Sequence, residues 1–192
     1  MGMMSFLVLL PYVVTAAPAA ESPVKVEVDW PAFLGRHDLV WDALPGEFDY
    51  GAFLGNGMLG TMIHQDGPQR LRWEMGRSDV TEHRRDNARL PIGGLVLTTA
   101  GEIQHGTMRM DLWNAEVRGT VTTDKGTITF RSFIHTHEMA LLTDLSRTGG
   151  EAAATLAWEA RPCVDHRNVK RFEAPPNPPA STCIVNGVNL CT

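Results

Sequence analysis

The sequence from residue 106 to residue 134, GTMRMDLWNAEVRGTVTTDKGTITFRSFI, decides the fold. Apolar and polar residues alternate along it with a period of two, which is typical of antiparallel strands that bury one face. The turn sequence Asp124-Lys125-Gly126 separates two of the alternating runs. The stretch therefore predicts an antiparallel meander. The positions expected to face inward are Met108, Met110, Leu112, Val117, Gly119, Val121, Ile128 and Phe130.

Strand patterns continue on both sides of this meander. The predicted strands are Val24–Val28, Met58–His64, Gln69–Met75, Ile92–Thr99 and Glu138–Leu145. Short strands separated by Gly, Asp and Pro turns, such as the one at residues 66–68, are typical of all-β proteins. The sequence therefore predicts an all-β fold, an antiparallel β-supersandwich of two packed sheets.

Three segments lack a clear strand pattern. Ser78–Ala88 is polar and has no apolar stripe, which predicts an ordered loop or a single turn. Glu151–Ala160 is rich in alanine but also fits strand alternation, so helix and strand both stay open. Phe172–Ser181 carries closely spaced prolines and is predicted to cross in an extended, polyproline-like conformation.

Composition excludes several classes of protein. The chain has 192 residues, enough for one ordinary domain, and 43% hydrophobic with 20% charged residues is typical of a globular protein. The net charge of −5 argues against a nucleic-acid partner, which requires a basic surface. No apolar stretch of about 18 residues lies in the body of the chain, which argues against several membrane spans.

The first 19 residues have the form of a secretory signal peptide. Residues 1–14 carry no charged side chain and contain a short apolar run, and small residues follow up to a cleavage site expected after Ala19. An uncleaved membrane anchor and a misassigned start codon are the alternatives. We expect a secreted or periplasmic protein that has no membrane contact after cleavage, with residues 20–29 as a lead-in to the mature domain.

The cysteines and a predicted hairpin lie near the end of the sequence. Cys163, Cys183 and Cys191 match no zinc-binding spacing, so one disulfide with a free thiol and three reduced cysteines both stay open. Thr182–Cys191 is predicted to be a hairpin around Asn186-Gly187. Because the sequence stops one residue after this hairpin, we expect the domain to be incomplete at its C-terminus.

Residues 55–60, GNGMLG, satisfy the dinucleotide-binding pattern G-x-G-x-x-G. That motif must open a helix whose N-terminus binds the pyrophosphate, and the turn at residues 66–68 leaves no room for such a helix. We therefore expect no cofactor. Three glycines in six residues instead favour close backbone packing or a bend at an interface.

The same residues carry a resemblance to a known family. Residues 41–45 read WDALP and residues 54–62 read LGNGMLGTM, which is similar to the opening of glycoside hydrolase family 95-type proteins. Residues 109–116, RMDLWNAE, and residues 130–134, FRSFI, resemble two strands of that group.

Residues 73–80, WEMGRSDV, depart from the fucosidase pattern and are closer to relatives grouped as an N-terminal domain of unknown function 5703. The resemblance covers about residues 30–192. It implies a β-supersandwich N-terminal domain, here truncated, that precedes an (α/α)6 barrel. In that group the barrel supplies the general acid and general base, so the resemblance assigns no catalytic residue to this chain.

The resemblance therefore predicts the accessory domain of an exported glycoside hydrolase, inactive alone, with the missing barrel as its intramolecular partner and carbohydrate as its ligand. The alternatives are a stand-alone carbohydrate-binding module and a small hydrolase that uses carboxylates between Glu74 and Asp86. The accessory-domain interpretation predicts a large exposed apolar face where the barrel docks.

A candidate substrate-facing surface lies between residues 73 and 84. Arg and His hydrogen-bond hydroxyl groups and aromatic faces stack on sugar rings, which makes candidates of Trp73, Arg77, Asp79, His83 and Arg84. The competing interpretation is a solvated segment in which arginines pair with the carboxylates.

Two further groups of residues have structural interpretations. His135 and His137 are expected on one face at a strand end, and we predict surface histidines there rather than a metal site. The tryptophans at positions 30, 41, 113 and 158 are expected in core or interdomain packing.

Overall fold

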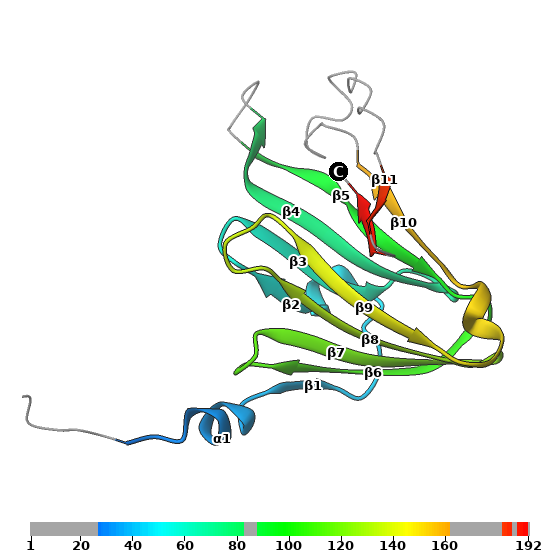
Figure 1. Cartoon of the computed structure of the whole chain (residues 1–192), viewed down its shortest axis with the longest axis horizontal. Helices are drawn as coiled ribbons and strands as arrows, with labels where there is room; N and C mark the ends of the chain where they lie inside the picture. Colours follow the sequence, from blue (N-terminus) through cyan, green and yellow to red (C-terminus); the bar gives the residue numbers. More distant parts are fainter. Residues whose placement is uncertain (1–26, 83–87, 162–181, 186–187, 192) are drawn as a thin grey trace, which may run out of the picture.

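The computed structural model describes residues 27–82, 88–161, 182–185 and 188–191. The predicted all-β sandwich is confirmed, because two five-stranded antiparallel sheets pack against each other (Figure 1). Sheet A has the spatial order β1 (Leu39–Trp41), β6 (Ile103–Asp111), β7 (Glu116–Thr123), β8 (Thr127–Ile134) and β9 (Leu141–Arg147). Sheet B has the order β10 (Thr155–Ala160), β5 (Ala88–Thr98), β4 (Arg70–Glu82), β3 (Leu59–Gln65) and β2 (Ala52–Gly55).

Short helices and one hairpin complete the described chain. Helix α1 (Trp30–Gly35) projects at the N-terminal end, and 3-10 turns η1 (Phe48–Tyr50) and η2 (Gly149–Ala153) lie where the chain passes between the sheets. The predicted C-terminal hairpin is confirmed as β11 (Thr182–Val185) paired with β12 (Val188–Cys191).

The meander predicted from residues 106–134 is confirmed as β6, β7 and β8, with the turn at residues 124–126 between β7 and β8. Its inward positions are buried as expected, except that Leu112 lies in the turn after β6. Gly119 is required there, because a Cβ at this position would clash with the ring of Phe130 on the neighbouring strand.

The two sheets meet around Trp73, which is fully buried on β4. Its ring lies edge-on to Phe130 of sheet A, with 5.3 Å between the ring centroids. Its Nε1 donates a hydrogen bond of 2.9 Å to Oγ of Ser132, which lies 3.1 Å from Oγ1 of Thr143. A buried indole N–H requires such a partner, so this contact fixes how the sheets face each other.

At one end of the sandwich, Glu151 joins three turns. Its buried carboxylate accepts hydrogen bonds from Ala100 N and Gly101 N, both at 2.9 Å, and from Thr123 Oγ1 at 2.6 Å. Burial raises the pKa of Glu151, but the hydrogen bonds from Thr123, Ala100 and Gly101 outweigh it and hold that pKa below its usual value.

Several sequence predictions are corrected. Ser78–Glu82 is not a loop but the end of β4, where Thr81 pairs with Arg89 and Glu82 with Ala88 after a bulge at Gly76. Pairing with β5 satisfies the backbone of Thr81 and Glu82, so a segment without an apolar stripe can still be a strand.

Other segments also differ from expectation. The part of Val24–Val28 that is described is not a strand, and β1, β2 and α1 have no predicted counterpart. The open segment Glu151–Ala160 is a 3-10 turn followed by β10, and the strand expected from Glu138 begins only at Leu141. Phe172–Ser181 lies outside the described residues. Of the four tryptophans, Trp30 and Trp113 are exposed and lie outside the core, so their interdomain packing stays a prediction.

The cross-sheet hydrogen bond leads to a first prediction. Ser132→Ala leaves the buried Nε1 of Trp73 without its acceptor, so we expect the free energy of unfolding to fall by about 1–3 kcal/mol. Urea denaturation measures this change. Ser146→Ala, at an exposed position on β9, is the control and should stay within about 0.5 kcal/mol of wild type. Equal effects of the two variants would contradict the assigned role.

A second prediction concerns pH. Because the pKa of Glu151 is lower in the folded than in the unfolded chain, its carboxylate stabilises the fold above the unfolded pKa. That contribution is lost as the pH falls through the folded pKa. Glu151→Gln should therefore cost about 1–3 kcal/mol near neutral pH, and the difference from wild type should shrink below about pH 4. Urea denaturation at several pH values measures the difference, and one that stays constant or grows on acidification would refute the assignment.

Candidate functional site

The outer face of sheet B carries an apolar groove of about 720 Å³ at the end where β2, β3 and β4 lie side by side. Large apolar side chains are exposed in it: Phe53 is 54% exposed, Phe48 48% and Met58 41%. Leu90 and Pro91 contribute from β5. We call this surface the sheet-B groove.

The GNGMLG sequence forms the turn beside this groove, between β2 and β3, and opens no helix. Gly57 has φ of 91°, a conformation that favours glycine. The side-chain Oδ1 of Asn56 accepts hydrogen bonds from Met58 N at 3.0 Å and Leu59 N at 2.9 Å. Its Nδ2 donates to two backbone oxygens in the β8–β9 turn, those of His135 at 2.9 Å and Glu138 at 3.1 Å. The motif is thus a structural tie between the two sheets.

The substrate-facing residues predicted from sequence do not form one surface. Trp73 is buried in the core, where its ring cannot stack on a sugar, so this prediction is wrong. Arg77 lines the sheet-B groove and forms an ion pair of 2.7 Å with Asp79. Hydrogen bonds from Arg77 lower the pKa of Asp79. His83 and Arg84 lie outside the described residues.

The carboxylates considered for hydrolysis also have structural partners. Glu74 is mostly buried and pairs with Arg72 at 3.4 Å and with Arg161 at 3.3 Å. The charged side chains around Arg72 form a network on the outer face of sheet B that also includes Asp66, Arg70 and Glu159. Asp86 lies outside the described residues, as does the side chain of Glu82. Among the described carboxylates, this region is therefore built from ion pairs.

The histidine and cysteine predictions have separate outcomes. His135 and His137 lie in the turn after β8 rather than on the strand, and Nδ1 of His135 accepts hydrogen bonds from the backbone of His137 and Glu138. The described residues contain no cluster of His, Cys, Asp and Glu suited to a metal ion. Cys183 lies on β11 and Cys191 on β12, while Cys163 is outside the described residues, so the disulfide remains a prediction.

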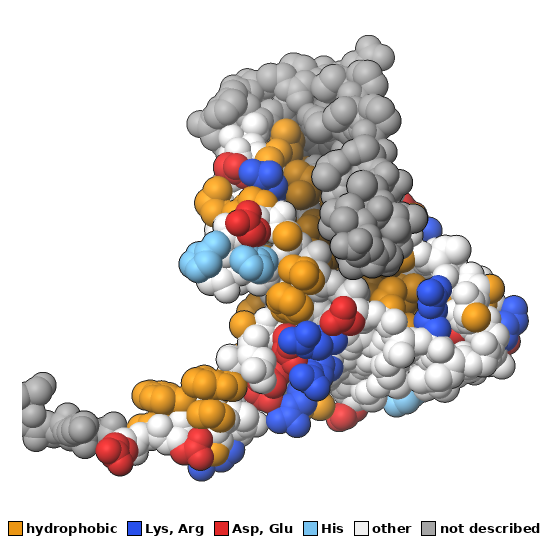
Figure 2. Space-filling model, viewed as in Figure 1, with side chains coloured by type: hydrophobic (Ala, Val, Ile, Leu, Met, Phe, Trp, Pro, Cys, Tyr) orange, Lys and Arg blue, Asp and Glu red, His pale blue; other side chains and the backbone are white. Residues whose placement is uncertain are grey.

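A second surface, on the outer face of sheet A, was missed by the sequence analysis. Cross-strand register places Arg109 of β6 opposite Arg118 of β7, and Arg118 opposite Arg131 of β8. Asp144 of β9 follows opposite Arg131. Figure 2 shows Lys and Arg side chains gathered in a line across this face. We call Arg109, Arg118 and Arg131 the arginine row.

Buried carboxylates hold the arginine row in place. Glu116 is only 1% exposed and accepts hydrogen bonds from Nε of Arg118 at 2.6 Å and Nε of Arg131 at 2.5 Å. The side chain of Asp38 is also buried, and its carboxylate accepts a hydrogen bond from Nε of Arg109 at 2.8 Å. The guanidinium groups therefore project from fixed points while remaining substantially exposed.

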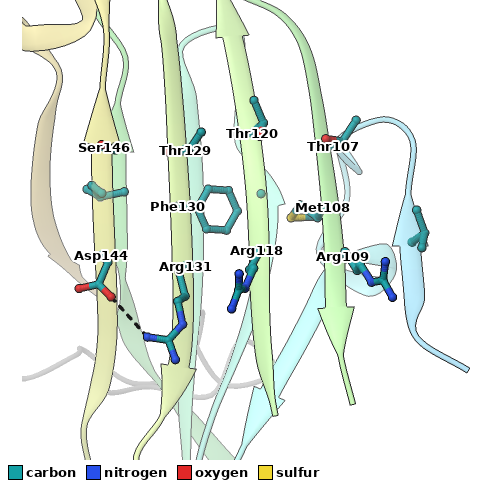
Figure 3. A pocket seen from close by; sticks show the side chains of 13 residues that line it. Thr107, Met108, Arg109, Arg118, Thr120, Thr129, Phe130, Arg131, Asp144 and Ser146 are labelled. Atoms are coloured by element: carbon teal, nitrogen blue, oxygen red, sulfur yellow. Dashed lines mark ion pairs between the residues drawn. The ribbon is translucent and has the colours of Figure 1, made fainter. Parts of the chain in front are cut away.

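A row of hydroxyl groups runs parallel to the arginine row, two residues away from it on each of β6, β7 and β8, and it continues two residues from Asp144 on β9. Its members lie opposite one another on β6 to β9, and they are Thr107, Thr120, Thr129 and Ser146. Both rows line one shallow depression of about 570 Å³ (Figure 3). Within the described part of the chain, none of the four hydroxyls has a hydrogen-bond partner.

The chemistry of this depression is that of a polar binding surface. Guanidinium N–H groups donate to carboxylates and other oxygen acceptors, and hydroxyls both donate and accept. Strand alternation already placed the three arginines and the threonines on the polar face of the meander. What the sequence did not supply is the register that aligns them.

Comparison with known proteins adds no assignment. No protein-family model matches the sequence, and no curated protein matches it either. In the described residues, no helix combines the length and apolar character needed to cross a membrane.

Proposed function

We propose that this chain is a non-catalytic accessory domain of an exported glycoside hydrolase, secreted or periplasmic, that docks on its catalytic barrel through the sheet-B groove. The observation that carries the proposal is the cluster of exposed apolar side chains in that groove. The resemblance of residues 41–45 and 54–62 to glycoside hydrolase family 95-type proteins supports the choice of partner.

The energetics favour a covered groove. Fully burying one large apolar side chain contributes about 1.5–3 kcal/mol, and the groove exposes several of them together. A concentrated apolar patch on a small domain is typical of an interaction surface.

Charged side chains at the edge of the groove fit the same interpretation. Arg77, Glu74 and Arg89 line it beside the apolar centre, and Arg77 already has its counter-ion in Asp79. An apolar centre with a polar rim is the usual anatomy of a protein interface.

A second candidate is a stand-alone carbohydrate-binding module. The polar depression on sheet A supports it, since neither of its rows requires a protein partner to complete it. In this case the domain binds a glycan without an attached catalytic domain.

The intact mass of the polypeptide recovered from its native cells separates the two candidates. We expect a product several times heavier than this chain, with the domain joined to a helical barrel. A product close to the mass of the chain without its signal peptide would refute the accessory role and favour the binding module.

A third prediction tests the groove directly. Phe53→Ser removes an exposed aromatic side chain from its centre, so we expect the isolated chain to bind less of an environment-sensitive apolar dye and to self-associate less. Fluorescence and analytical ultracentrifugation measure the two effects. Phe33→Ser on α1, an exposed phenylalanine outside the groove, is the matched control. Equal changes in both variants would show that the groove is not the surface responsible for dye binding and self-association.

A further inference from the structure

We propose that the outer face of sheet A binds an acidic polysaccharide whose uronate carboxylates contact the arginine row and whose hydroxyls contact the parallel hydroxyl row. This inference deepens the proposed function, on which it rests for the choice of a saccharide, and it uses a different sheet from the docking groove.

The arginines are arranged for such a ligand before it arrives. Nε of Arg118 is committed to Glu116, and its two terminal nitrogens have no hydrogen-bond partner among the described residues. Arg131 likewise commits Nε to Glu116, and its Nη1 lies 3.6 Å from Asp144 (Figure 3). Because anchored side chains lose little further conformational entropy on binding, this arrangement favours affinity.

The spacing of the rows suits an extended chain. Adjacent strands lie about 4.8 Å apart, so the arginine row extends over two such steps, or about 10 Å. Positions two residues apart along a strand are separated by about 7 Å, which places the hydroxyl row beside the arginines rather than beyond their reach. The depression is open, so a polymer can pass through it without threading into a closed pocket.

The net charge of this surface and the hydroxyl groups on it together indicate which kind of anion it binds. Three arginines are offset by Asp38, Glu116 and Asp144, so the surface carries little net charge, and the whole chain carries −5. A nucleic acid, with a phosphate at every nucleotide, requires a clear excess of positive charge. A uronate ring presents one carboxylate together with hydroxyl groups, which matches guanidinium donors that lie beside a row of hydroxyls.

Isothermal titration of the full chain with tetragalacturonate tests this inference. We expect binding by the wild type, weaker binding at higher salt, and little binding of the fully methyl-esterified tetrasaccharide, which keeps its ring hydroxyls but lacks the charges. Arg118→Gln should weaken binding about tenfold or more, since it removes charge-assisted hydrogen bonds.

Two further variants separate the contribution of the hydroxyl row from effects unrelated to this surface. Thr120→Val leaves the ion pairs of Glu116 intact and should weaken binding severalfold through the lost hydroxyl. Arg36→Gln, at an exposed position that ends α1 outside both surfaces, is the matched control and should bind as the wild type does. Thermal melts establish that each variant is folded.

The inference is overturned if the wild type shows no binding at millimolar ligand, if Arg118→Gln and Thr120→Val bind as tightly as it does, or if the neutral ester or single-stranded DNA binds equally well. Failure of this test leaves the sheet-B results standing, because dye binding and intact mass are measured without any saccharide. If the docking proposal fails, the titration still measures whether the outer face of sheet A binds the saccharide.

Discussion

The indole of Trp73 lies between the two sheets, with its ring against Phe130 and its Nε1 hydrogen-bonded to Ser132. This contact combines apolar burial with a directional bond, so it specifies one packing of sheet B on sheet A rather than any apolar contact between them. Around it the inner residues of both sheets form a single core. Glu151 and Asn56 then tie turns at two further places on the sandwich.

Once the inner faces are fixed, each strand presents its alternate residues outward, and the two outer faces differ in chemistry. Sheet B exposes an apolar groove with Phe53 and Met58, while sheet A exposes the arginine row beside free hydroxyls. One face is suited to covering by protein and the other to a polar ligand. The proposals assign these two tasks to opposite sides of one core.

The sequence predicted the class of fold well because strand alternation is local: the meander from β6 to β8 and its turn at residues 124–126 followed from neighbouring residues alone. It failed where pairing with a distant strand overrides local pattern. Ser78–Glu82 lacks alternation yet forms the end of β4, because Thr81 and Glu82 pair with β5 and Ser78 N donates a hydrogen bond to Met58 O. The same limit hid the sheet-A surface, since Arg118 and Arg131 are aligned only by register. Trp73 was assigned outward because its residue type suits sugar stacking, although its position between Leu71 and Met75 already favoured the core.

Amide chemical shifts mapped by NMR during titration with tetragalacturonate test the division of the two faces most directly. The account predicts shifts concentrated on β6 to β9 at the arginine and hydroxyl rows, with the residues of the sheet-B groove unchanged. Shifts centred on β2 to β4, or spread evenly over both sheets, would contradict it.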